Sequence, residues 1–207
     1  MKHLVTAALG FLMFGCAGKS LTEAIAPQFE AQPDCGFAQD QYGERMTWHT
    51  LPIRIGVHTS FPAEYYSTLL LAIKDWETAV GKPLFQLLNT PVSGPVISRQ
   101  DGLNLIYIAT TWDPARSWEQ GRTDASQHGN AVVEADIVLD ARYFNFYLDT
   151  PKTVSDIHLE SLLVHELGHV LGLKHTDAQS VMNPSLHGIQ IRTKPTKLDV
   201  SNINCGY

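Results

Sequence analysis

Residues 165–175 read HELGHVLGLKH, and the spacing of the three histidines in this stretch decides the fold. His165 and His169 are four residues apart, so on an α-helix they lie about 40° apart around the axis and one turn apart along it. Both imidazoles can therefore reach one metal ion. His175 can join them only if the chain turns back, because on a continued helix it would point about 120° away from His169. We expect that turn at Gly172, since glycine readily takes up the left-handed conformation that commonly ends helices.

Three neutral imidazoles leave the fourth position of a tetrahedral zinc ion open to water, which is the pattern of a catalytic zinc site. The sequence therefore predicts one zinc ion bound by His165, His169 and His175. Glu166 follows the first of these ligands and lies about 100° further around the helix. In that position it can act as the general base that takes a proton from the water and passes it to the leaving amine.

The hydrophobic pattern places this helix in an α/β layout, with a sheet backed by helices. The helix itself is expected to start near Ser155, because residues 153–156 have the spacing of a capping box, and to end at Leu171. His158, seven residues before His165, is expected to be a polar surface residue. The remaining predicted elements are a strand within Trp48–His58, a long helix over Ala63–Val80, a central strand within Asp101–Thr110, and, after a polar connection over 111–130, two strand segments over 131–133 and 135–139.

The N-terminus has the pattern of an export signal. Lys2 is followed by an apolar run over residues 4–14, which is too short to span a bilayer and typical of a signal peptide. The four residues Met13–Cys16 resemble a bacterial lipobox, in which the cysteine is lipidated and becomes the new N-terminus. We therefore expect a signal peptide over 1–15, a lipid-anchored tether over 16–44 and one domain over 45–207. Ordinary signal cleavage nearby, giving a periplasmic or secreted soluble protein, is the alternative to an outer-membrane or cell-surface lipoprotein.

The other two cysteines, Cys35 and Cys205, lie near the two ends of the domain. Disulfides persist in exported proteins, so we predict that these two pair. An alternative stays open, because residues 33–36 (PDCG) faintly resemble the cysteine switch by which some metalloproteases close their own zinc site with a thiolate. The net charge of −6, with scattered lysine and arginine residues, indicates that nucleic acid is not a partner.

The zinc motif, together with the residues after it, resembles the extended signature of the metzincin metalloproteases. Residues 180–184 (SVMNP) resemble the Met-turn of the matrixin branch, in which Met182 packs beneath the imidazoles. The similarity extends over about residues 45–207. It implies a twisted, mostly parallel five-stranded sheet with two long helices, the zinc-site helix as the floor of a cleft, and a short C-terminal subdomain that ends in a helix. The loop after Pro184 would then wall the main pocket.

The resemblance also implies that a polypeptide substrate lies as an extended strand along the edge of the sheet. Calcium is possible, with Asp136, Asp140 and Asp149 as candidate ligands. A second zinc ion, as vertebrate-type matrixins have, is doubtful because His128 is the only histidine between Gly121 and Asp140.

The sequence thus predicts a monomeric zinc endopeptidase. Two other functions stay open: a non-catalytic surface module that binds peptides and keeps zinc for stability, and a zinc hydrolase that acts on something other than protein. Glu166 argues against the first of these, because a purely structural zinc site needs no base.

Overall fold

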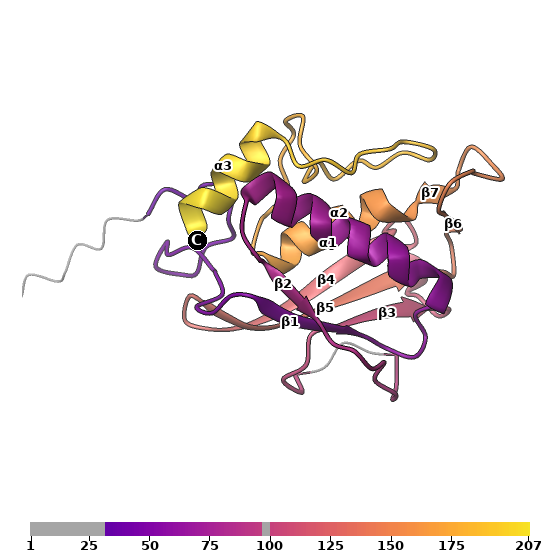
Figure 1. Cartoon of the computed structure of the whole chain (residues 1–207), viewed down its shortest axis with the longest axis horizontal. Helices are drawn as coiled ribbons and strands as arrows, with labels where there is room; N and C mark the ends of the chain where they lie inside the picture. The colour runs from indigo at the N-terminus through magenta and orange to yellow at the C-terminus, as the bar shows by residue number, and fades with distance from the viewer. Residues whose placement is uncertain (1–31, 97–99) are drawn as a thin grey trace, which may run out of the picture.

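The computed structural model describes residues 32–96 and 100–207 (Figure 1). The predicted signal peptide, the lipidation site Cys16 and most of the predicted tether lie outside the described residues. No helix in the described ranges is both long and apolar enough to cross a membrane. The elements are, in chain order, β1 (Ile53–Val57), a 3₁₀ turn (Ala63–Tyr65), α1 (Tyr66–Val80), β2 (Phe85–Leu87), β3 (Leu105–Ala109), a second 3₁₀ turn (Pro114–Arg116), β4 (Gly121–His128), β5 (Ala131–Asp140), β6 (Phe146–Tyr147), β7 (Ile157–His158), α2 (Leu159–Val170) and α3 (Lys197–Gly206).

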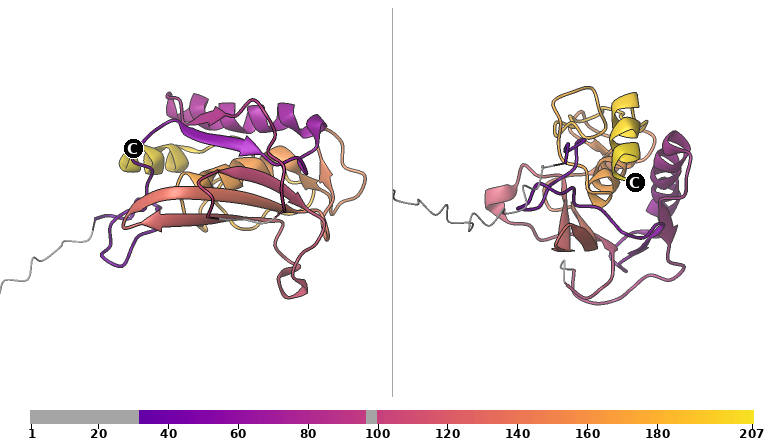
Figure 2. Two further views of the ribbon diagram at one scale, coloured as in Figure 1. Left: turned by 90° about the horizontal axis from the view of Figure 1, so that it is seen from below. Right: turned by 90° about the vertical axis from the view of Figure 1, so that its left-hand side faces the viewer.

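The main sheet has five strands in the order β2-β1-β3-β5-β4, and only β4 runs antiparallel to its neighbour. This confirms the predicted α/β fold with a mostly parallel five-stranded sheet and the predicted central position of the strand within Asp101–Thr110. The parallel strands are largely buried, as expected where helices connect and cover them. Helices α1 and α2 lie on the same side of the sheet (Figure 2).

Two parts of the sheet differ from the prediction. The two segments predicted over residues 131–139 form one continuous strand, β5, because its polar residues bind backbone groups: Glu134 accepts a hydrogen bond from the amide of Gly102, and Asp136 accepts one from the amide of Leu105 at 2.8 Å. The polar stretch predicted as a connection contains the edge strand β4. An edge strand that is only partly covered needs no alternating apolar residues, so its sequence gives no strand signal.

Helix α1 packs across α2 and fixes it over the sheet. The Trp76 side chain of α1 is fully buried, and its indole N–H donates to the carbonyl of Val164 in α2 at 2.8 Å. Gly81 ends α1 in the left-handed conformation with φ = 79°, at the predicted position. Helix α2 is therefore held by α1 on one flank and by β4 and β5 of the sheet on another.

Helix α2 starts later in the chain than the sequence predicts. The helix begins at Leu159 and not near Ser155, because residues 157–158 form β7, which pairs with β6. The Asp156 carboxylate accepts hydrogen bonds from the amides of Lys152 and Thr153, so the capping-box spacing belongs to a turn before β7. His158 is buried and not on the surface: its ring nitrogens contact the Ser161 hydroxyl and the Leu148 carbonyl.

The N-terminal part of the described chain, which precedes the predicted domain start near Arg45, packs onto the domain. Phe37 is fully buried, and the amide of Ala38 donates to the carbonyl of Gly172 at 3.0 Å. The predicted disulfide between Cys35 and Cys205 is present, and it joins this segment to α3. Because Cys35 is bonded to another cysteine, it offers no free thiolate, and the structure does not have the cysteine switch.

Candidate active site

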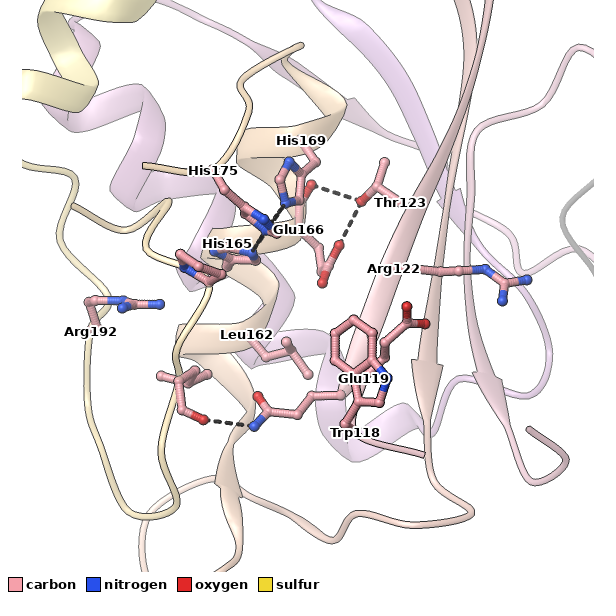
Figure 3. A pocket seen from close by; sticks show the side chains of 14 residues that line it. Trp118, Glu119, Arg122, Thr123, Leu162, His165, Glu166, His169, His175 and Arg192 are labelled. Atoms are coloured by element: carbon pink, nitrogen blue, oxygen red, sulfur yellow. Dashed lines mark hydrogen bonds between the residues drawn. The ribbon is translucent and has the colours of Figure 1, made fainter. Parts of the chain in front are cut away.

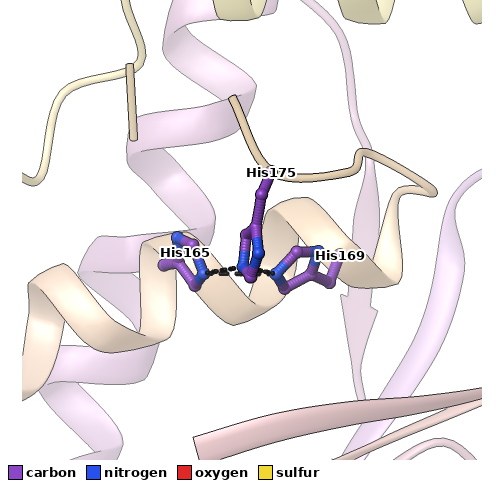
Figure 4. A group of neighbouring side chains, drawn as sticks. All are labelled: His165, His169 and His175. Atoms are coloured by element: carbon purple, nitrogen blue, oxygen red, sulfur yellow. Dashed lines mark hydrogen bonds between the residues drawn. The ribbon is translucent and has the colours of Figure 1, made fainter. Parts of the chain in front are cut away.

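The three motif histidines converge on one point (Figure 4). His165 and His169 come from α2, His175 comes from the chain that follows it, and the three Nε2 atoms lie 3.0–3.2 Å from one another. With Zn–N bonds of 2.0–2.1 Å, tetrahedral ligands are separated by about 3.3 Å. The arrangement therefore fits a zinc ion bound by three imidazoles. In the described ranges, no other set of three or more histidine, cysteine, aspartate or glutamate side chains lies close enough to hold a metal ion.

The second ring nitrogen fixes the orientation of two of the ligands. Nδ1 of His165 lies 2.8 Å from the carbonyl oxygen of Val181, and Nδ1 of His169 lies 2.7 Å from that of Leu173. A carbonyl can only accept, so each Nδ1 must carry the proton, which leaves the Nε2 lone pair for the metal.

The turn after α2 brings His175 to the other two histidines. Gly172 has φ = 95°; its amide donates to the carbonyl of His169, and the amide of Leu173 donates to the carbonyl of Gly168. These two bonds form a Schellman motif, which closes the helix end and reverses the chain. The structure thus places Gly172 at the turn that the spacing requires.

The environment keeps the three imidazoles neutral, which is the form that binds a metal. Burial lowers the pKa of His165 to about 3 and that of His169 to about 4, and the charge of a neighbouring histidine adds to the effect in each case. The pKa of His175 is also lowered, mainly by burial.

Glu166 is buried beside the histidine cluster, on the side that faces β4. Its Oε2 accepts a hydrogen bond of 2.8 Å from the hydroxyl of Thr123 in β4. A Cβ atom at Gly121 would lie 3.1 Å from Oε1, so glycine is the residue that leaves room for this carboxylate. Burial raises the pKa of Glu166 to about 7, although the Thr123 hydroxyl opposes the shift. Thr123 is not among the site residues predicted from the sequence, because β4 has no alternation of apolar residues.

Met182, predicted as the methionine of a Met-turn, packs against Gly168 of α2. Its side chain is buried, and its sulfur lies so close to Gly168 that a Cβ atom there would be 2.2 Å away. Asp199 of α3 holds this turn, because its carboxylate accepts hydrogen bonds from the Ser180 hydroxyl and, at 3.2 Å, from the amide of Val181. The same Val181 accepts from His165 through its carbonyl, so α3 orients a metal ligand through the turn.

A pocket of about 320 Å³ opens in front of the histidine cluster (Figure 3). One side of it is formed by residues 118–123, at the start of the edge strand, and the other by Pro184, Leu186 and Arg192. The Gln120 amide joins the two sides through a hydrogen bond of 2.7 Å to the carbonyl of Leu186. The loop after Pro184 therefore lines this pocket.

The carboxylates considered for calcium do not gather into a site. Asp136 bonds the amide of Leu105, and Asp140 bonds the amides of Arg142 and Tyr143. Neither belongs to a cluster of ligands among the described residues, and neither does Asp149. Calcium binding is therefore not supported.

Comparisons with known proteins include the part of the chain that holds the histidine cluster. The model of the matrixin peptidase family matches residues 97–207. A search of curated proteins gives no match. Among solved structures, the chain is similar to high choriolytic enzyme 1, a hatching enzyme zinc-protease from the medaka fish Oryzias latipes, with a TM-score of 0.41 and 10% sequence identity, over 77% of this chain and 93% of that one.

Proposed function

The chain belongs to the matrixin family of zinc metalloproteases, and from this membership we propose that it is an endopeptidase in which Glu166 is the general base. The observation that carries the proposal is the position of Glu166, buried and oriented by Thr123 beside three converging histidines. His165, His169 and His175 would hold a zinc ion, which would lower the pKa of its water and polarise the scissile carbonyl.

The two oxygens of Glu166 have different roles in this mechanism. Oε2 accepts the Thr123 hydroxyl, whereas Oε1 has no protein partner in the described ranges and is the atom that exchanges the proton. Burial raises the pKa of the Glu166 carboxyl, which makes its carboxylate a stronger base for the proton of the water that it later passes to the leaving amine. Gly121 keeps the space around Oε1 open.

The substrate is proposed to bind as an extended strand antiparallel to β4. This strand is one edge of the sheet, and no further strand among residues 32–96 and 100–207 pairs with it. Main-chain hydrogen bonds to β4 would give affinity for any extended polypeptide, and the pocket beside the histidines would select a side chain.

Glu166→Gln tests the catalytic role against the alternative of a non-catalytic peptide-binding module. The variant should bind zinc as the wild type does, while cleavage of unfolded casein falls by about 10²-fold or more. Glu64→Gln, a change at an exposed carboxylate away from the pocket, is the matched control and should cleave normally. Normal cleavage by Glu166→Gln would show that Glu166 is not the general base. Zinc binding without any cleavage by the wild type would favour the binding module.

Export and anchoring through Cys16 are part of the proposal, with a signal peptide over 1–15 and a tether before the packed domain. The protein is proposed to act as a monomer. Cys16→Ser followed by cell fractionation tests the anchor: the variant should leave the membrane fraction, and unchanged membrane association would remove the lipoprotein assignment.

A further inference from the structure

We propose that Arg192 makes the pocket selective for a carboxylate of the substrate, on the C-terminal side of the scissile bond. The inference rests on the proposed peptidase function, since it names the chemistry that the same cleft prefers. The candidate carboxylates are the side chain of an aspartate or glutamate and the free C-terminus of the peptide.

Arg192 is held in place at both ends. Its backbone amide donates to the Ser161 hydroxyl of α2 at 2.7 Å. Its guanidinium donates to the carbonyls of Asn183 at 2.6 Å and Ser185 at 3.2 Å. Figure 3 shows the side chain pointing into the pocket, toward His165. A guanidinium fixed in this way loses little conformational entropy when it binds an anion.

The charge of Arg192 is not neutralised by an ion pair within the described part of the chain. Its Nε atom is buried without a hydrogen-bond partner, and its Nη1 and Nη2 atoms donate to uncharged carbonyls. Burial lowers the pKa of Arg192 and the charge of the Asp199 carboxylate opposes that shift, but Asp199 is buried and forms no ion pair with it. Its oxygens already accept hydrogen bonds from Ser180, Val181 and Thr196. The guanidinium therefore keeps its positive charge without a carboxylate partner beside the pocket.

Two other charged side chains of the lining, Glu119 and Arg122, each have an ion-pair partner. Glu119 bonds Arg116 at 2.8 Å, and Arg122 bonds Asp124 at 2.9 Å. Glu119 also lies on the opposite side of the pocket from Arg192 (Figure 3). An incoming carboxylate thus meets the unpaired cation of Arg192, while Glu119 on the far side of the pocket is bound to Arg116.

The direction of the substrate places Arg192 after the scissile bond. A strand antiparallel to β4 runs from the His128 end of β4 toward Gly121, so its C-terminal part leaves past Gln120. Gln120 bonds the carbonyl of Leu186, which lines the same side of the pocket as Arg192. The side chain that enters the pocket therefore belongs to the C-terminal half of the substrate.

Two pairs of peptides, each cleaved at one mapped bond, test the proposal. The first pair carries glutamate or glutamine after the scissile bond and has an amidated C-terminus. The second pair carries glutamine there and ends with a free or an amidated C-terminus. We expect a preference of about tenfold in kcat/KM for the carboxylate member of one pair, as a charge-assisted hydrogen bond gives, and we expect it to shrink at high salt. The pair that responds identifies the source of the carboxylate.

Three variants separate charge from structure. Arg192→Gln should bring the ratio within the responding pair to about one, and Arg192→Lys should keep part of it because the charge remains. Loosening of the loop alone would lower cleavage of both members equally and leave the ratio unchanged. Arg54→Gln removes an exposed charge outside the pocket and should leave the ratio as in the wild type.

Binding gives a readout that does not depend on catalysis. The same peptides can be titrated against the Glu166→Gln protein, with dissociation constants measured by fluorescence anisotropy. If no peptide or protein is cleaved by the wild type but the carboxylate peptides bind more tightly through Arg192, the peptidase proposal fails and the carboxylate site stands. Equal affinity within both pairs, or a preference that survives Arg192→Gln, overturns the inference.

Discussion

Replacing Gly172 with alanine tests whether the turn after α2 positions the third ligand. Gly172 has φ = 95°, and an added Cβ atom would lie 2.4 Å from the carbonyl oxygen of Met46 and 3.1 Å from the Phe37 ring. The left-handed conformation alone costs alanine about 1 kcal/mol. An ordinary contact between carbon and oxygen is about 3.3 Å, so the backbone must also move by about 1 Å, and overpacking of this kind costs about 1–3 kcal/mol.

Gly81→Ala is the matched control for this change. Gly81 has φ = 79°, and an added Cβ atom there meets nothing within 4 Å, so the variant carries the conformational cost without the collision. Urea unfolding of the metal-free proteins should show a loss of about 1 kcal/mol for Gly81→Ala. The loss for Gly172→Ala should be about 2–4 kcal/mol.

Zinc affinity should separate the two variants further. Metal bonds tolerate displacements of only about 0.2 Å, so a shift of the turn before His175 should weaken zinc binding by about tenfold or more in Gly172→Ala. Gly81→Ala should bind zinc as the wild type does. Equal losses of stability in the two variants, with zinc affinity unchanged in both, would refute the role given to Gly172.

Three further changes probe other parts of the structure. Gly168→Ala gains about 1 kcal/mol of helix propensity, but its Cβ atom collides with the sulfur of Met182, and overpacking of this kind costs about 1–3 kcal/mol. We therefore expect a net loss of up to about 2 kcal/mol in thermal unfolding, relieved by Met182→Ala; a more stable single variant would contradict this. Cys35→Ser opens a loop with a sequence separation of 170 residues and should lower the free energy of unfolding by roughly 5 kcal/mol at most; unfolding in urea unchanged from the wild type would exclude a stabilising disulfide. In the metal-free protein the histidines stay neutral in the fold, so stability should fall as pH drops below 6.5. The pKa of Glu166 is raised from 4.5 to about 7, so the folded protein binds this proton before the unfolded chain does, which offsets part of that loss. The free energy of unfolding of Glu166→Gln should therefore fall more steeply between pH 6.5 and 4.5, by the slope of about one proton. Equal slopes in the two proteins would contradict the raised pKa.

The ligand set was predictable from the sequence because it depends on local geometry. Helical spacing places His165 and His169 on one face, and a glycine three residues after His169 explains how His175 returns. The central strand and α1 were predictable for a related reason, since burial on both faces or on one face leaves a periodic apolar pattern.

The features that the sequence did not reveal depend on contacts between distant segments. Thr123 lies on an edge strand with no apolar alternation, so neither the strand nor its bond to Glu166 could be anticipated. Phe37 is one apolar residue in a polar stretch, and only the folded domain shows that it is buried. Similarly, the capping-box spacing before α2 was misleading because Asp156 closes a local turn instead.

Zinc titration of the metal-free protein, with casein cleavage as the readout, is the most direct test of the central claim. We predict that cleavage is absent after chelation, rises in proportion to added zinc and stops rising at about one zinc per chain, as a single site with three histidines requires. His175→Ala, which lacks one ligand, should need a large excess of zinc or stay inactive. Cleavage that survives complete removal of zinc, or folded protein that binds none, would contradict the account.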